Sequence, residues 1–285
     1  MFQLTRKIFA LFGYRLSRKK PRRNFASLSK YEGSSNNLIK ELLENLYDRQ
    51  SPYSAVDTRY RDEDYPHTNI TTELLETLFV HVHEPRFILE FGSMLGGSAM
   101  IMAQSVKRHG CDANIVCVDP FTGDANMWAW EASRPGWKFL RLEDGIPTIY
   151  KRFLANVYCN QHNDIIFPIN CTTSVGVKLL SRLREEGRIT SFPNYIYLDS
   201  AHEPDETLLE LRLCWSLLED NGVLFGDDWG WEAVRNDVLT FSREITIDES
   251  ALENALNLLP GSEIVDGKIL LFQKQWVLFS PGLTA

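Results

Sequence analysis

The 285-residue sequence contains no apolar run that approaches the roughly 20 residues of a membrane-spanning helix. Internal repeats and long low-complexity tracts are also absent. There are only five cysteines, none in a Cys-x-x-Cys spacing, and Cys117 and Cys214 stand within apolar runs. This pattern indicates buried, reduced thiols rather than a disulfide framework. We therefore expect a cytoplasmic protein with one large α/β domain and extensions.

Positive charge is scarce over most of the chain. Nine of the 30 Lys and Arg residues fall within residues 1–30, which hold no acid, so residues 31–285 carry 21 basic and 38 acidic side chains. We expect no nucleic-acid partner, because phosphate groups repel so acidic a body. Residues 1–23 mix positive charge with apolar side chains, which fits a membrane-surface helix, a transit segment or a helix that begins a soluble protein.

The pattern of apolar residues divides the chain into three parts. Residues 1–36 form a basic arm and linker, residues 37–84 a helical extension, and residues 85–285 the main domain. In the main domain, helical patterns alternate with apolar runs at residues 86–90, 114–119, 165–170, 195–199 and 222–228. This alternation predicts a doubly wound, mostly parallel sheet. The Asp266-Gly267 turn predicts an antiparallel strand pair near its end.

Polar or flexible residues end four of the five apolar runs. They are Gly92, Asp119, Asp199 and the pair Asp227-Asp228. In an open α/β sheet, ligands bind beyond the carboxyl ends of the strands, so we expect the site at this edge.

The first run leads into a glycine-containing loop, "EFGSMLGGS", and then into a helix. Such a loop lets the backbone approach a ligand closely. Ser93 and Met94 follow Gly92, so the G-x-G-x-x-G pattern of dinucleotide-binding proteins is missing. Asp119, 27 positions after Gly92, is placed to accept the hydroxyls of a ribose, which indicates an adenosine ligand.

The segments "ILEFGSMLGGS" and "IVCVDPFTGD" resemble the glycine motif and the ribose-binding strand of class I S-adenosylmethionine-dependent methyltransferases. The resemblance covers roughly residues 85–275 and implies a seven-stranded Rossmann-like sheet with S-adenosylmethionine as cofactor. The residues that it assigns to the cofactor are Glu90, Gly92, Ser93, Gly96, Ser98, Asp119 and Thr172.

Three carboxylates on neighbouring strand ends suit a hard divalent cation. Here "LDSAHEPDE" and "FGDDW" resemble the metal-dependent sugar O-methyltransferases of macrolide and aminocoumarin biosynthesis. That resemblance implies that Asp199, Asp227 and Asp228 bind Mg²⁺ or Mn²⁺ and that His202 is the catalytic base. The expected reaction is methylation of a hydroxyl on a sugar, a glycan or another small polyol-like acceptor.

Several alternatives stay open at this point. The chain could be a binding protein that has kept the fold without catalysis, or a methyltransferase for a catechol or a lipid-linked acceptor. A Rossmann-type oxidoreductase is disfavoured by the missing glycine pattern. The tryptophan-rich residues 121–148, with Trp128, Trp130 and Trp137, are interpreted either as a lid over the acceptor or as a packed surface segment. Assembly into a homo-oligomer is left open.

Overall fold

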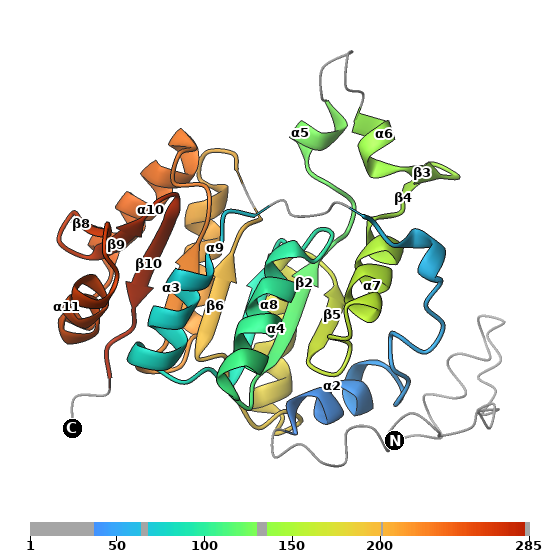
Figure 1. The fold of residues 1–285 in the computed structure, drawn as a ribbon, viewed down its shortest axis with the longest axis horizontal. Coiled ribbons are helices and arrows are strands. Elements are labelled where there is room, and N and C mark those ends of the chain that lie inside the picture. Colours follow the sequence, from blue (N-terminus) through green and yellow to red (C-terminus); the bar gives the residue numbers. More distant parts are fainter. Residues whose placement is uncertain (1–36, 64–67, 130–135, 201, 283–285) are drawn as a thin grey trace, which may run out of the picture.

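The chain is described by a computed structural model over residues 37–63, 68–129, 136–200 and 202–282. Its centre is an eight-stranded sheet with the order β5-β2-β1-β6-β7-β10-β9-β8, covered by helices on both faces (Figure 1). This confirms the predicted α/β class with a mostly parallel sheet. The expectations for residues 1–36 and for Trp130 lie outside the described residues.

The first five strands of this order run parallel, and the last three are antiparallel. The strands are β1 (Phe87–Phe91), β2 (Asn114–Asp119), β5 (Ile166–Asn170), β6 (Tyr195–Leu198), β7 (Val223–Gly226), β8 (Glu263–Val265), β9 (Ile269–Phe272) and β10 (Gln275–Phe279). The hairpin expected around Asp266-Gly267 joins β8 to β9. The sheet has eight strands where seven are expected, because the short strand β8 adds to the edge beyond β9. The last strand of the chain, β10, lies between β7 and β9.

Buried helical faces explain why the parallel strands are apolar throughout. One face of the sheet packs against α2 (Leu38–Leu46), α8 (Thr173–Glu185), α9 (Glu206–Leu217) and α10 (Glu232–Glu244). The other packs against α3 (Thr72–Glu76), its π-helical continuation η3 (Thr77–Val82), α4 (Gly97–His109), α7 (Ile149–Cys159) and α11 (Glu249–Leu258). Every residue of β1, β2, β6 and β7 is buried, as expected for strands covered on both faces.

The strand register brings the carboxyl ends of the central strands together. Phe91 is paired with Leu198, and Leu198 with Gly226, so the residues that follow β1, β6 and β7 meet at one edge. Between β2 and α7, the chain forms a projecting insertion (Figure 1). It contains α5 (Ala125–Trp128), α6 (Gly136–Leu140) and the short pair β3 (Leu142–Glu143) and β4 (Ile146–Pro147). The 3-10 turn η2 (Thr58–Tyr60) packs on α7.

None of the helices in the described part of the chain is both long and apolar enough to cross a membrane.

Candidate active site

The glycine loop between β1 and α4 is folded tightly against the next strand end. Gly92 has φ +85° and Gly96 has φ +87°, in the left-handed region that favours glycine. Asp119, at the end of β2, stabilises the loop because its carboxylate accepts the backbone N–H of Met94 at 2.8 Å. The same carboxylate also accepts the N–H of Phe121. Asp119 therefore connects the glycine loop to the segment that begins the insertion.

Glu90 lies behind this loop and not in the cavity. Its carboxyl group is fully buried and accepts the hydroxyl of Ser98, while the thiol of Cys117 lies 3.1 Å from its other oxygen. Burial raises the pKa of Glu90, against the smaller opposing effect of these hydrogen bonds. Glu90 thus holds Ser98, which does line the cavity.

A cavity of about 390 Å³ opens at the carboxyl edge of the sheet. This volume lies within the range of about 300–1,000 Å³ that is typical of small-molecule sites. Of the residues expected at the cofactor, Gly92, Ser93, Ser98 and Asp119 line the cavity. Gly96 and Thr172 do not, and Thr173 takes the place expected for Thr172. From the insertion, Asp124, Asn126, Met127 and Phe139 close the opposite wall.

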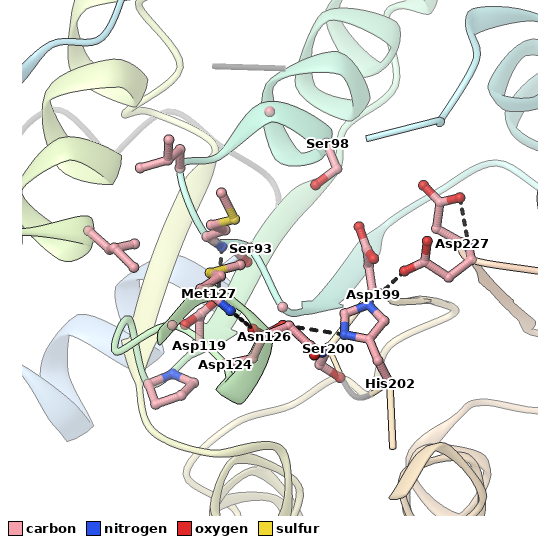
Figure 2. A pocket seen from close by; sticks show the side chains of 18 of the residues that line it. Ser93, Ser98, Asp119, Asp124, Asn126, Met127, Asp199, Ser200, His202 and Asp227 are labelled. Carbon is pink, nitrogen blue, oxygen red and sulfur yellow. Dashed lines mark hydrogen bonds and ion pairs between the residues drawn. The ribbon is translucent and has the colours of Figure 1, made fainter. Parts of the chain in front are cut away.

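Three polar side chains gather at the far end of the same cavity: Asp199, His202 and Asp228. One ligand atom from each lies within 4.8 Å of those of the other two. Nε2 of His202 is 2.7 Å from Asp228, and its Nδ1 is 3.5 Å from Asp124. Figure 2 shows the imidazole beside Asp199, connected by dashed lines to its carboxylate partners. The structure thus groups residues from two strand ends and from the insertion around one histidine.

Mutual charge alters the protonation of this cluster. Burial raises the pKa of Asp199 well above its usual range, and the charges of Asp228 and Asp227 act in the same direction. For His202, burial alone would lower the pKa, but hydrogen bonds to Asp124 and Asp228 outweigh it and raise the pKa to about 10. Burial alone would raise the pKa of Asp228, but the hydrogen bond from His202 and the positive charge of that imidazole lower it. The charge of Lys274 lowers it further, by a smaller amount. Without a metal ion, the imidazole is therefore protonated at neutral pH.

The carboxylate of Asp227 is turned toward a different partner. It accepts the backbone N–H of Asn69 at 2.7 Å and the side-chain amide of Asn69 at 3.0 Å. It also accepts the N–H of Asp228 at 2.8 Å and the hydroxyl of Tyr197 at 3.4 Å. Asp227 lines the cavity but stands outside the group of three. Its expected part as a metal ligand stays a prediction and would require rearrangement of the bonds to Asn69.

Some residues of the site were not expected from the sequence. Asp124 is hydrogen-bonded to His202, which is the largest cause of its lowered pKa, and it also caps α5 through the N–H of Met127. Its signal was present, because Asp124 ends the segment "IVCVDPFTGD". The ring of Trp231 lies 5.2 Å from that of His202, and Asn69 enters from a distant loop. Neither carries a local sequence signal.

This fold and this site together define the class I methyltransferase type: a doubly wound sheet with a glycine loop after β1, an acid after β2 and an antiparallel C-terminal group. A family model described as a methyltransferase domain matches residues 89–229. The matched stretch runs from β1 to the loop after β7, so it contains the glycine loop and the cluster around His202.

No curated protein matches the chain. Similar solved structures include a protein from Staphylococcus aureus assigned as a caffeoyl-CoA O-methyltransferase, with 12% identity and a TM-score of 0.45 over 85% of this chain and 98% of that one. Another is an O-methyltransferase from Bacillus cereus in complex with SAH, with 14% identity and a TM-score of 0.38 over 98% and 99% of the two chains. Similarity at this level does not indicate a substrate.

Proposed function

We propose that the chain transfers the methyl group of S-adenosylmethionine to a hydroxyl oxygen of a small acceptor, with help from a divalent cation. The observation that carries this proposal is a single cavity with two chemically different ends. One end is the glycine loop with Asp119, and the other is the cluster of Asp199, His202 and Asp228. Such an arrangement suits a cofactor at the first end and a hydroxyl group at the second.

The cofactor end supports a nucleoside with a charged substituent. The loop from Gly92 to Gly96 allows close approach of a ligand to the backbone, and the first turn of α4 follows directly. The acidic surroundings suit the positive charge of a sulfonium better than the pyrophosphate of a dinucleotide.

The donor set at the other end fits Mg²⁺ or Mn²⁺. The two carboxylates of this set, Asp199 and Asp228, have oxygens within 4.8 Å of each other, a span that a small inward movement would bring to the roughly 4.2 Å across an octahedral Mg²⁺. In our proposal Asp199 and Asp228 hold the cation, and His202 stays free of it. A bound cation would supply positive charge that lowers the pKa of an acceptor hydroxyl.

His202 is then the proton acceptor. Its high pKa arises from the hydrogen bonds to Asp124 and Asp228 and from the charges of Asp228 and Asp199. A cation held by Asp199 and Asp228 would remove their part of this effect and lower the pKa of His202. The neutral imidazole can take the proton from the acceptor hydroxyl as the oxygen attacks the methyl carbon. Asp124, 3.5 Å from Nδ1, orients the ring for this step. A sugar or other polyol as acceptor rests on the resemblance of "LDSAHEPDE".

Calorimetry with S-adenosylmethionine, its demethylated product and NAD tests the cofactor, and a screen with labelled cofactor tests the reaction. The screen would offer sugars, glycolipids and catechols, each with Mg²⁺ and with EDTA. We expect binding of the first two ligands but not of NAD, and methyl transfer that EDTA abolishes.

Isosteric variants separate the roles at the cluster. Asp199→Asn should weaken Mg²⁺ binding at least tenfold, whereas His202→Gln should retain the metal and lose methyl transfer. Asp220→Asn, an exposed carboxylate just before β7 at the opposite edge of the sheet, is the matched control and should change neither. Full activity of His202→Gln across pH 6–9 would disprove its role as base. Failure to bind either S-adenosylmethionine or its product would disprove the function as a whole.

A further inference from the structure

A second cavity lies directly beside the candidate site and is open to the surface. It is lined by Asp228, Gly230, Trp231, Glu232 and Lys274. Asp228 and Trp231 line both cavities, so the two are neighbours with a common wall. A molecule in the outer cavity therefore lies next to the proposed metal ligand Asp228.

Trp231 offers this outer cavity a flat apolar surface. Its ring packs against His202 with 5.2 Å between the ring centroids and 42° between the planes. The residue is nevertheless 45% exposed, although it is a large apolar side chain. Half-exposed indole rings suit the binding of other rings, since they contribute contact area without needing to be ordered by the ligand.

Lys274 brings a positive charge to this otherwise acidic place. Among the described residues that line the two cavities, it is the one Lys or Arg. The described part of the chain provides no ion-pair partner for its amino group. Asp228 and Glu232 line the same cavity without pairing with it. The charge is thus available to a ligand.

The backbone fixes Lys274 relative to Asp228 and Trp231. Lys274 belongs to the two-residue turn between β9 and β10, and its carbonyl oxygen accepts the N–H of Trp229 at 3.0 Å. The N–H of Trp231 in turn donates to the carbonyl of Asp228 at 2.8 Å, closing a tight turn with Asp228 at φ +62°. A left-handed non-glycine residue of this kind persists where its surroundings hold it, and such residues cluster at functional sites. These hydrogen bonds fix the backbone of Lys274, Trp231 and Asp228 relative to one another.

We propose that the outer cavity is the acceptor subsite and that it selects a hydroxylated ring carrying a carboxylate. The ring lies on Trp231, the carboxylate pairs with Lys274, and a ring hydroxyl faces Asp228 and His202. This rests on the proposed function. The amino group of Lys274 can form a charge-assisted hydrogen bond with an anionic substituent, which a neutral acceptor cannot make. The other charged residues that line the two cavities are the acids Asp119, Asp124, Asp199, Asp227, Asp228 and Glu232, besides His202. The same acids disfavour an anion elsewhere in the mouth, so Lys274 also sets the orientation of the ring.

Binding of matched neutral and acidic probes tests this assignment. The pairs are glucose with glucuronate and catechol with 3,4-dihydroxybenzoate, titrated into full-length protein loaded with Mg²⁺ and S-adenosylhomocysteine. In at least one pair the carboxylate should bind about tenfold more tightly than its neutral partner, as a charge-assisted hydrogen bond implies. Lys274→Met should abolish this preference, and Lys274→Arg should retain it. Lys178→Met, an exposed lysine on α8 that lines neither cavity, is the control.

The outcomes separate this proposal from the function on which it rests. A preference that persists in Lys274→Met, or no binding of either carboxylate to the cofactor-loaded wild type, overturns the acceptor subsite. The acceptor subsite is also overturned if Lys274→Met weakens Mg²⁺ binding and leaves the preference for the carboxylate probe unchanged. Lys274 would then act on Asp228 alone. If S-adenosylhomocysteine itself does not bind, the proposed function fails first.

Discussion

At Gly92, the glycine loop lies directly against the backbone of Asp199 and Ser200. A Cβ at this position would lie 1.9 Å from the carbonyl oxygen of Asp199 and 2.8 Å from the Cα of Ser200. Both contacts are to backbone, which cannot move aside as a flexible side chain would. The glycine loop and the strand end that carries Asp199 are therefore packed against each other without space between them.

We expect Gly92→Ala to lose more than about 3 kcal/mol of unfolding free energy and most of its affinity for S-adenosylhomocysteine, because the clash adds to the strain of positive φ. Gly110→Ala is the control: Gly110 also has a positive φ, +69°, but an added Cβ would meet nothing within 4 Å. It should lose only about 1 kcal/mol. Urea denaturation measures both, and equal losses would show that the contact with Asp199 is unimportant.

At the residue scale, the sequence predicts which strand ends carry acids but not what each acid contacts. Asp199 and Asp228 meet at His202 because strand ends converge by topology, and topology follows from the pattern of apolar runs. The bond between Asp227 and Asn69 joins residues 158 positions apart through a loop that has no pattern. Asp62, whose side chain is paired far from its own segment, could not have been identified for the same reason.

At the scale of elements, a buried ion pair connects four segments around the cavity. The guanidinium of Arg152 on α7 donates to both oxygens of Asp62 at 2.9 and 3.0 Å, and to the carbonyl of Phe139 at 2.8 Å. One turn along α7, Asn156 bonds the N–H of Asp62 at 2.8 Å and the carbonyl of Leu95 at 3.0 Å. Helix α7 therefore fixes the insertion and the glycine loop together.

Arg152→Met should cost about 3–5 kcal/mol, since removing one partner leaves the buried carboxylate of Asp62 poorly compensated. Binding of S-adenosylhomocysteine should also weaken, because both Phe139 and Leu95 line the cavity. Arg182→Met breaks an exposed pair with Glu186 on α8 and should cost less than about 0.5 kcal/mol. Chemical denaturation and calorimetry give the two readouts. A similar small loss for Arg152→Met would mean that Arg141, 2.9 Å from Asp62, suffices.

Element prediction succeeded where the period of apolar residues was clear. Within residues 37–84, where a helical extension is expected, the structure has α2 and α3 with η3, and Thr71 caps α3 through the N–H of Leu74. The insertion was harder, because α5 and α6 span only four and five residues and bury few side chains. Short exposed helices of this kind lack the periodicity on which such a prediction depends.

For the molecule as a whole, α2, the first helix of the described residues, is part of the central core. Leu38, Ile39, Leu42 and Leu43 are buried in the same cluster as β1, β2 and β5 residues. Polar contacts support this packing: Glu41 accepts the N–H of Thr190 at 3.0 Å, and the hydroxyl of Tyr47 donates to the carbonyl of Pro168 at 2.8 Å. Residues 37–46 are therefore expected to unfold together with the sheet.

Leu42→Ala should lower the unfolding free energy by about 2–5 kcal/mol. Unfolding should remain a single transition, with the same urea midpoint by circular dichroism and by tryptophan fluorescence. Leu209→Ala, at a position on α9 that is 54% exposed, should change it by less than about 0.5 kcal/mol. Two separate transitions would contradict the view that α2 shares one cooperative core with the sheet.

The interior position of β10 also affects how a newly made chain matures. β10 fills the place between β7 and β9, and the indole of Trp276 covers Gly226 and donates to the carbonyl of Asp227 at 2.9 Å. Trp276 is synthesised 77 positions after Asp199, which at about 5–20 residues per second is a delay of several seconds. Until then β7 presents an open edge with unpaired backbone groups, which favours pairing with another chain. Lys274 lies in the turn that joins β9 to β10, so its backbone reaches its final position only when β10 pairs.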